Sequence, residues 1–192
     1  MRYMLAWAVS VALIAGCSAA QTGRTLVRHD FNSSAQGWIV SGDTRPADAI
    51  FTQTGGQPGG CITGVDEALG ETWYFLAPAE VLRQLPNAIS GTLSYSLKQS
   101  GPIISLFDDD IVILGGGGRL SYRFPTFPGT GWTDFSVRLS ASAGWTWNWN
   151  QKASQAQIVA VLAAPTLLQI RGEYITGDDM GSLDNFVLRS AP

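Results

Sequence analysis

Three tryptophans that alternate with polar residues, in the segment GWTWNWN at positions 144–150, form the part of this sequence best suited to binding a ligand. In an extended strand the side chains alternate between two faces, so the three indoles would share one of them. Aromatic rings offer a flat apolar surface to the C–H faces of sugars, and neighbouring amides can hydrogen-bond hydroxyl groups. The candidate ligand-binding residues are therefore Trp145, Trp147, Trp149, Asn148 and Asn150. In the alternative, Trp145 fills the core and the other two tryptophans cover a sheet edge.

A carboxylate within an apolar strand is the second feature with chemical consequences. The segment LDNFVL at 183–188 predicts a buried strand that carries Asp184 and Asn185. An unpaired buried charge is strongly unfavourable. Asp184 therefore needs a cation, a group of backbone N–H donors or a ligand as its partner.

Asp30, Asp66 and Asp184 are predicted at three strand ends that a β-sandwich can bring together. Calcium takes about six to eight oxygen ligands, which carboxylates and backbone carbonyls supply. A structural calcium ion is therefore the one cofactor that the sequence suggests. In the alternative, Asp184 accepts hydrogen bonds from backbone N–H groups of a neighbouring loop, and the other two aspartates are solvated turn residues.

Three consecutive aspartates, Asp108, Asp109 and Asp110, repel one another unless they are solvated or bound to a cation. A strand is predicted to start at the next residue, so we expect a solvated turn at a hairpin tip. A calcium or ligand site is the alternative. The glycine run at 115–118 lacks the Lys-Ser/Thr pair of a phosphate-binding loop, and we expect a hairpin turn or bulge there.

The sequence lacks the motifs of common enzyme classes: it has no Gly-x-Ser-x-Gly, His-Glu-x-x-His or Cys-x-x-Cys. Its one histidine, His29, cannot build a typical zinc site. The remaining catalytic possibility is a glycosidase pair in which Glu173 acts with Asp178 or Asp179. We therefore expect a protein without catalytic activity.

The N-terminus has the pattern of an export signal. Arg2 precedes an apolar stretch at 4–14 that is too short to span a membrane comfortably. The motif IAGC at 14–17 resembles the lipobox of bacterial lipoproteins, in which cleavage precedes a cysteine whose thiol is acylated. Ser18 then favours the outer membrane of the cell envelope. In the alternative, a signal peptide is cut after Ala20 and the protein is secreted or periplasmic.

These signals predict a signal peptide at 1–16, a lipidated tether at 17–25 with Cys17 as the acylated residue, and one domain at 26–190. Cys61 then has no disulfide partner, and we expect a small buried residue rather than a reactive thiol. Removing residues 1–16 lowers the basic residues from 12 to 11 against 15 acidic ones, a net charge of about −4. This charge argues against a nucleic-acid partner, which needs a clustered basic surface.

Secondary-structure signals predict an all-β protein. Residues 92–98 alternate strictly, with Leu93, Tyr95 and Leu97 on one face, as in a half-buried strand. Further strands are predicted at 62–65, 72–76, 111–114, 120–124, 135–139, 167–174 and 183–188, and short helices at 79–85 and 154–163. We expect a jelly-roll β-sandwich of two antiparallel sheets with two short helices, and Trp38, Trp73 and Trp132 in its core.

The order of several short motifs resembles the laminin IV type A domain, also called the laminin B domain, as it occurs alone in bacterial exported proteins. The resemblance runs from Asp30 to Leu188 and rests on GW at 37–38, GGQPGG at 55–60, WYF at 73–75, GTLSY at 91–95, GEY at 172–174 and LDN at 183–185. It implies a jelly-roll related in shape to carbohydrate-binding modules and a role in adhesion or extracellular recognition. Cys61, where that family usually has a larger residue, and the extra Trp147 and Trp149 depart from the pattern.

Together these features predict an extracellular recognition or adhesion module that binds a glycan or matrix polymer and is held at the membrane by its N-terminal lipid. One alternative is a structural envelope protein that contacts other proteins. The other is a carbohydrate-active enzyme. The sequence does not specify the oligomeric state.

Overall fold

The computed structural model describes residues 23–42, 44, 48–66, 70–102 and 108–192. The predicted signal peptide, most of the tether and the lipidation site Cys17 lie outside the described residues. Strand β1 begins at Thr25 and the last strand, β13, ends at Arg189. None of the helices in the described ranges is both long and apolar enough to cross a membrane.

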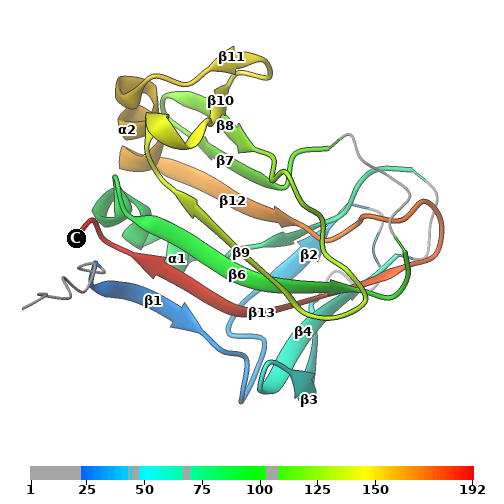
Figure 1. Cartoon of the computed structure of the whole chain (residues 1–192). Helices are drawn as coiled ribbons and strands as arrows, with labels where there is room; N and C mark the ends of the chain where they lie inside the picture. Colours follow the sequence, from blue (N-terminus) through cyan, green and yellow to red (C-terminus); the bar gives the residue numbers. More distant parts are fainter. Residues whose placement is uncertain (1–22, 43, 45–47, 67–69, 103–107) are drawn as a thin grey trace, which may run out of the picture.

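Two antiparallel sheets pack face to face (Figure 1). In sheet A the strands follow the order β3 (Ile50–Gly56), β4 (Gly59–Val65), β13 (Met180–Arg189), β6 (Thr92–Gln99) and β9 (Thr133–Arg138), and β1 (Thr25–His29) also pairs with β13. In sheet B the order is β11 (Gln151–Lys152), β10 (Thr146–Trp147), β8 (Gly118–Tyr122), β7 (Ile111–Gly115), β12 (Pro165–Arg171), β5 (Tyr74–Leu76) and β2 (Ile39–Ser41).

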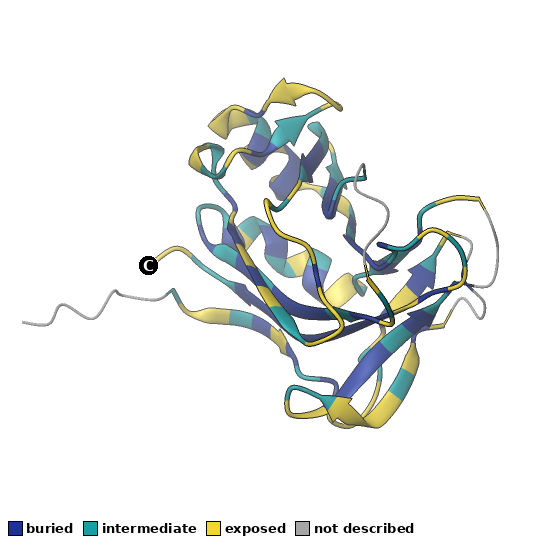
Figure 2. Ribbon diagram, turned by 45° about the vertical axis from the view of Figure 1, so that its right-hand side comes forward, coloured by how far each residue is buried: buried dark blue, intermediate teal, exposed yellow. Residues whose placement is uncertain are grey.

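Alternation along the strands places the core between the two sheets. On β6, Leu93, Tyr95 and Leu97 join the buried core cluster, as the sequence pattern predicted. On β7, Ile111 and Ile113 do the same from the opposite sheet. Figure 2 shows the buried residues along the strands of both sheets, whereas β3 and the β10–β11 hairpin are largely exposed.

Two short α-helices are present: α1 (Ala79–Gln84), which leads into the 3₁₀ helix η1 (Leu85–Ala88) between sheet B and sheet A, and α2 (Gln155–Ala163), which joins β11 to β12 within sheet B. A second 3₁₀ turn, η2, covers Ala141–Ala143. Ser154 forms a capping box with Gln157 at the start of α2. The predicted β-sandwich of two antiparallel sheets with two short helices is therefore confirmed.

The glycine run at 115–118 is the tight turn between β7 and β8, as predicted. Gly118 has a φ of 118°, which disfavours residues with a side chain. The turn also lies against α2, because a Cβ on Gly117 would approach the Cβ of Ala160 to 2.7 Å. The glycines therefore allow the turn and the close helix contact, and they do not form a phosphate-binding loop.

Two other expectations for single residues have different outcomes. Cys61 is buried and free, with its Sγ 3.2 Å from Thr52 Oγ1, as expected of a small structural residue. Trp132 was expected in the core, but it is only partly buried. Its indole Nε1 donates to the carbonyl of Gly55 at 3.2 Å, and the ammonium of Lys98 lies 4.7 Å from the ring centre. Trp132 therefore covers the outer face of sheet A.

Candidate ligand-binding face

The outer face of sheet B has a hollow of about 450 Å³. Because Ile113, Leu120 and Leu168 point into the core, their neighbours on β7, β8 and β12 point outward. The residues that line the hollow are Tyr74, Asp108, Asp109, Val112, Leu114, Arg119, Arg123, Trp149, Leu167 and Gln169. The sheet-B hollow, as these residues are called below, thus has an apolar floor with charged and aromatic side chains around it.

The three alternating tryptophans do not share one face. Trp145 is only 1% exposed, and its Nε1 donates to the carbonyl of Arg138 at 2.7 Å. Trp147 is partly buried, and its Nε1 donates to the carbonyl of Gly117 at 2.9 Å. Trp149 is 75% exposed. The expectation of one continuous tryptophan strip is therefore wrong, and Trp149 is the tryptophan available to a ligand.

A hairpin turn explains this separation. Asn148 and Trp149 have φ angles of 43° and 82°, so the chain reverses between β10 and β11 and the alternation ends at Trp147. Asn148 attaches the turn to β8 through two hydrogen bonds with Arg119. Its Oδ1 accepts from the backbone N of Arg119 at 3.0 Å, and its backbone N donates to the Arg119 carbonyl at 2.9 Å. Asn150 is exposed beside it.

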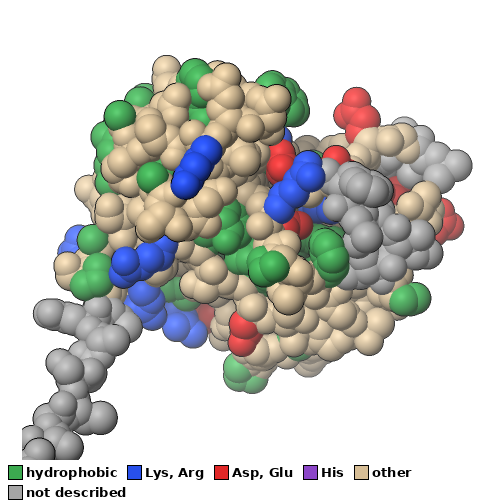
Figure 3. All heavy atoms as spheres, turned by 45° about the horizontal axis from the view of Figure 1, so that its top comes forward, with side chains coloured by type: hydrophobic (Ala, Val, Ile, Leu, Met, Phe, Trp, Pro, Cys, Tyr) green, Lys and Arg blue, Asp and Glu red, His purple; other side chains and the backbone are tan. Residues whose placement is uncertain are grey.

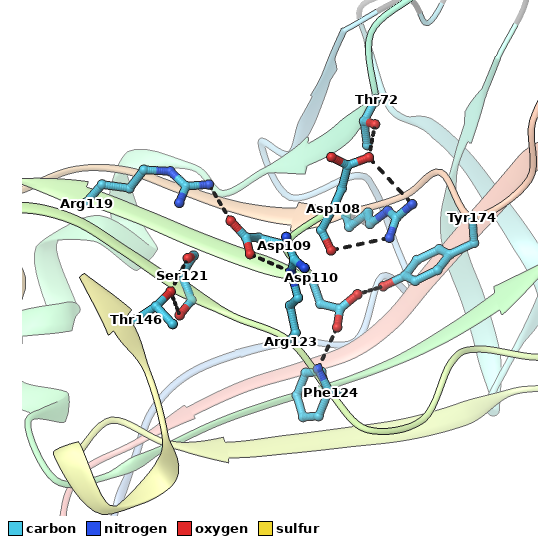
Figure 4. A network of polar contacts seen from close by, with 11 residues as sticks. Thr72, Asp108, Asp109, Asp110, Arg119, Ser121, Arg123, Phe124, Thr146 and Tyr174 are labelled. Atoms are coloured by element: carbon cyan, nitrogen blue, oxygen red, sulfur yellow. Dashed lines mark hydrogen bonds and ion pairs between the residues drawn. The ribbon is translucent and has the colours of Figure 1, made fainter. Parts of the chain in front are cut away.

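Arg119 connects Trp149 to the charged part of the hollow. Its guanidinium carbon lies 4.2 Å from the centre of the Trp149 ring, the geometry of a cation–π contact. Its Nη2 donates to Asp109 Oδ2 at 2.7 Å, and Arg123 Nε donates to Asp109 Oδ1 at 2.9 Å (Figure 4). The Nη1 of Arg119 is buried and has no hydrogen-bond partner among the described residues. The rest of the Arg119 guanidinium is held by Asp109 and Trp149.

The three consecutive aspartates do not form a solvated turn, because each has partners of its own (Figure 4). Asp108 accepts from Thr72 Oγ1 at 2.6 Å and lies 3.8 Å from Nη2 of the buried Arg171. Asp110 is 2% exposed and accepts from the Tyr174 hydroxyl at 2.7 Å. Three arginines from β8, its following loop and β12 offset the repulsion that the sequence alone suggested.

Two pKa shifts describe the protonation of this region. Burial raises the pKa of Tyr74 to about 12, with the Asp108 carboxylate adding to the shift. Burial also raises the pKa of Asp110, although the backbone N–H of Phe124 donates to its carboxylate at 2.6 Å and opposes the change. Tyr74 therefore keeps its proton at neutral pH and can donate a hydrogen bond within the hollow.

The three predicted calcium ligands are not all brought together: Asp30 lies near enough to Asp184 to add to the rise that burial causes in the pKa of Asp184, but Asp66 does not join them. Asp184 accepts from the backbone N of Gln57 and of Asn185, each at 2.6 Å. Asp66 is buried near Asp179 instead, at the other end of the β4–β13 pairing. Within the described ranges no group of three or more His, Cys, Asp or Glu side chains is placed to hold a metal ion. The calcium site stays a prediction. The partners found for Asp184 are backbone N–H groups, as in the alternative to a metal site.

The carboxylates considered as a glycosidase pair hold Trp73. Glu173 Oε2 accepts from the Trp73 backbone N at 3.1 Å, and Asp179 Oδ1 accepts from the Trp73 indole Nε1 at 3.1 Å. Asp178 is exposed in the loop beside them. Burial, followed by smaller contributions that include the nearby Asp66, raises the pKa of Asp179 to about 6. The geometry gives Glu173 and Asp179 a structural role around a fully buried indole.

Comparison with known proteins identifies the family. The laminin B (Domain IV) family model matches residues 74–192, which is 119 of the 192 positions. The chain belongs to the laminin B (Domain IV) family. No curated protein sequence matches it.

Solved structures show the same fold at low sequence identity. The L4b domain of human laminin alpha-2 superimposes with a TM-score of 0.60 and 13% identity, over 87% of this chain and 99% of that one. The family 11 carbohydrate-binding module from Clostridium thermocellum, in complex with a β-1,3-1,4-mixed-linked tetrasaccharide, gives a TM-score of 0.51 and 12% identity over 90% and 98%. These similarities establish the β-sandwich fold.

Sequence reasoning missed most of the hollow. Of its lining residues, Trp149 was named as a ligand-binding candidate, while Asp108 and Asp109 were expected in a solvated turn, with a calcium or ligand site as the alternative. A signal was present, because continued alternation along β8 places Arg119, Ser121 and Arg123 on one face. That signal becomes informative only when β10 is known to pair with β8 and bring Trp149 over Arg119.

Proposed function

We propose that the protein is an extracellular recognition module that binds a glycan through the sheet-B hollow, with Trp149 as the surface on which a sugar ring packs. The observation that carries this proposal is an indole that is 75% exposed yet held in place by the Arg119 guanidinium beneath it. A fixed, exposed indole offers a flat apolar surface on which the C–H face of a sugar ring can pack. A preformed hollow with a few fixed polar groups is typical of sites for small ligands and cofactors.

The polar groups of the hollow suit hydroxyl groups. Tyr74 offers a donor, and Asp108 and Asp109 offer acceptors whose positions are fixed by Thr72 and the arginines. Val112 and Leu114 provide an apolar floor between them. The acidic and basic side chains are paired at this face (Figure 3), so neutral polysaccharides are the first candidates. The carbohydrate-binding modules that share the fold support the same class of ligand.

Replacing Trp149 by alanine tests the proposal. We expect affinity electrophoresis in gels that contain neutral polysaccharides to reveal binding to at least one of them. Trp149→Ala should weaken the affinity for that polysaccharide about 30-fold, which is the effect of removing a hot-spot aromatic residue. The matched control is Trp132→Ala, which removes a partly exposed tryptophan from the outer face of the other sheet and should leave the affinity unchanged. Absence of binding to every polysaccharide would favour the alternative of a structural envelope protein.

We also propose that the protein is a lipoprotein of the cell envelope, anchored through Cys17, with cleavage after Ala20 and release as the alternative. The motif IAGC at 14–17 carries this proposal. Cells that express the chain with labelled palmitate should yield a labelled protein, and Cys17→Ala should abolish the label. The buried Cys61 is the internal control, because Cys61→Ala should keep it. Equal labelling of the Cys17→Ala variant would refute the anchor.

A further inference from the structure

A group of arginines lies where the described chain begins. Arg189, Thr92 and Arg138 are register partners on the adjacent strands β13, β6 and β9. Their side chains point away from the core, because the neighbouring Leu93, Val137 and Leu188 point into it. Arg28, on β1, is exposed on the same side, and Arg24 is exposed just before β1. The four arginines Arg24, Arg28, Arg138 and Arg189 are called the basic face below; Figure 3 shows Lys and Arg side chains gathered beside the start of the described chain.

The basic face makes no close ion pairs among the described residues, although Arg28 lies near enough to Asp184 to oppose the rise in the pKa of that carboxyl. The ion pairs found among the described residues involve His29, Arg119, Arg123 and Arg171, and none of the four arginines of the basic face. Arg189 Nη1 donates instead to Thr25 Oγ1 at 2.8 Å. Many of the acidic side chains, among them Asp66, Asp108 and Asp178, belong to loops at the other end of the sandwich. A protein with a formal net charge of −3 thus carries an unneutralised positive surface at its terminal end.

The basic face contains a hollow with donors suited to phosphate. The hollow measures about 300 Å³, and its lining includes Arg138, Arg189, Ser90, Ser136 and Ser190. Guanidinium and hydroxyl groups are strong donors to phosphate oxygens, and arginine binds them in a bidentate way. The Arg138 guanidinium forms no ion pair with a carboxylate of the described residues, and its side chain is exposed to an external anion.

The chain that precedes the structure indicates what this anion is. Gly23 lines the same hollow, and its carbonyl accepts from Arg189 Nη1 at 3.5 Å. Five residues lie between it and Cys17, so the two positions are at most about 20 Å apart when the segment is fully extended. The apolar stretch at 4–14 precedes that cysteine. A lipid on Cys17 would place the membrane surface within this reach of the basic face.

We propose that the basic face rests on anionic phospholipid headgroups of the membrane that holds the N-terminus. The phosphates lie against Arg138 and Arg189, with Arg24 and Arg28 nearer the tether. Because the basic face is on the outer side of sheet A, this orientation directs the outer face of sheet B, with Trp149, away from the membrane (Figure 1). The proposal uses the N-terminal tether but does not depend on glycan binding.

Vesicle co-sedimentation tests this orientation. The full chain carrying Cys17→Ser, which has no acylation site, is mixed with vesicles of pure phosphatidylcholine or of phosphatidylcholine with 30% phosphatidylglycerol. Any binding through the apolar stretch occurs with both kinds of vesicle. The amount of protein bound to the anionic vesicles, divided by the amount bound to the neutral vesicles, therefore reports on charge. Each basic residue near an anionic surface raises binding about fivefold, so Arg138→Gln with Arg189→Gln should lower the ratio roughly 25-fold.

The charge-matched control is Arg83→Gln with Lys152→Gln, which removes two exposed positive charges from α1 and β11. We expect this control to keep the ratio within about twofold and added salt to lower it, as for screened charges. Equal loss in both double variants, or no preference for the anionic vesicles, would overturn the proposal. Trp149→Ala should bind the vesicles normally, so failure of the glycan proposal and failure of this one are distinguishable.

Discussion

Trp73→Ala is expected to leave most of the protein unfolded at 37 °C. Trp73 is fully buried, and three glycines make room for its ring: a Cβ on Gly172, Gly64 or Gly181 would lie 1.8, 2.4 or 3.0 Å from it. Truncating a buried tryptophan costs about 3–5 kcal/mol, and the surrounding glycines cannot fill the cavity. The carboxylate of Asp179 also loses its indole donor, at a further ~1–3 kcal/mol. The sum approaches the ~5–15 kcal/mol that stabilises a typical domain.

Urea unfolding followed by circular dichroism measures this loss. The matched control is Trp38→Ala, which removes an equally buried indole whose Nε1 donates to His29 Nδ1 at 2.7 Å rather than to a carboxylate. We expect a large loss there as well, but a smaller one than at Trp73. A Trp73→Ala variant that unfolds within about 1 kcal/mol of the parent would contradict the packing described around Gly172.

Trp73→Phe separates the hydrogen bond from the volume of the ring through its pH dependence. The pKa of Asp179 is raised to about 6, so the stability that comes from its protonation is present below 3.8 and is lost as the pH rises through about 6. The Trp73 indole donates to the carboxylate and holds this pKa down. Without that donor the pKa rises further, so the free energy lost by Trp73→Phe should be larger at pH 7 than at pH 4. Equal losses at the two pH values would show that the hydrogen bond contributes nothing.

Asp184→Ala is expected to release the β3–β4 hairpin from sheet A at a cost of roughly 2–5 kcal/mol, the penalty for leaving two buried N–H groups without acceptors. The side chain is fully buried and accepts from the backbone N of Gln57, at the hairpin tip, and from that of Asn185. The Asn185 side chain completes the attachment, because its Nδ2 donates to the Gln57 carbonyl at 2.5 Å. Burial raises the pKa of Asp184, while the backbone N–H groups of Gln57 and Asn185 oppose the shift.

Thermal unfolding gives the loss of stability, and hydrogen exchange at the Gln57 amide reports on the hairpin directly. Asp134→Ala is the matched control on the same face: this exposed carboxylate accepts from Ser96 Oγ and from the Gln57 side chain, so its loss should cost under about 1 kcal/mol. If Gln57 exchanges no faster in Asp184→Ala than in Asp134→Ala, the backbone donors are not what neutralises position 184.

Local patterns predicted the fold well because they act over a few residues. The strict alternation at 92–98 became β6, and Ser154 before an apolar periodic stretch became the cap of α2. The sequence also indicated that Asp184 needs a partner. It could not identify the partner, since Gln57 lies 127 residues away in the chain.

The candidate site was less predictable for the same reason. The tryptophan strip was interrupted by a turn at Asn148, where positive φ angles replace the extended backbone that alternation assumes. The acidic residues at 108–110 looked solvated because their partners are separated from them in sequence, from 10 residues for Arg119 to 64 for Tyr174. Strand pairing, rather than residue spacing, assembled both features.

The most direct test of the sheet-B hollow as a glycan site follows the indole N–H resonances of the 15N-labelled protein by NMR during titration with a polysaccharide that it binds. The Trp149 resonance should shift or broaden in step with binding, while those of the buried Trp38, Trp73 and Trp145 stay unchanged. Binding that perturbs Trp132 on the opposite face and leaves Trp149 untouched would place the glycan elsewhere and contradict the proposed site.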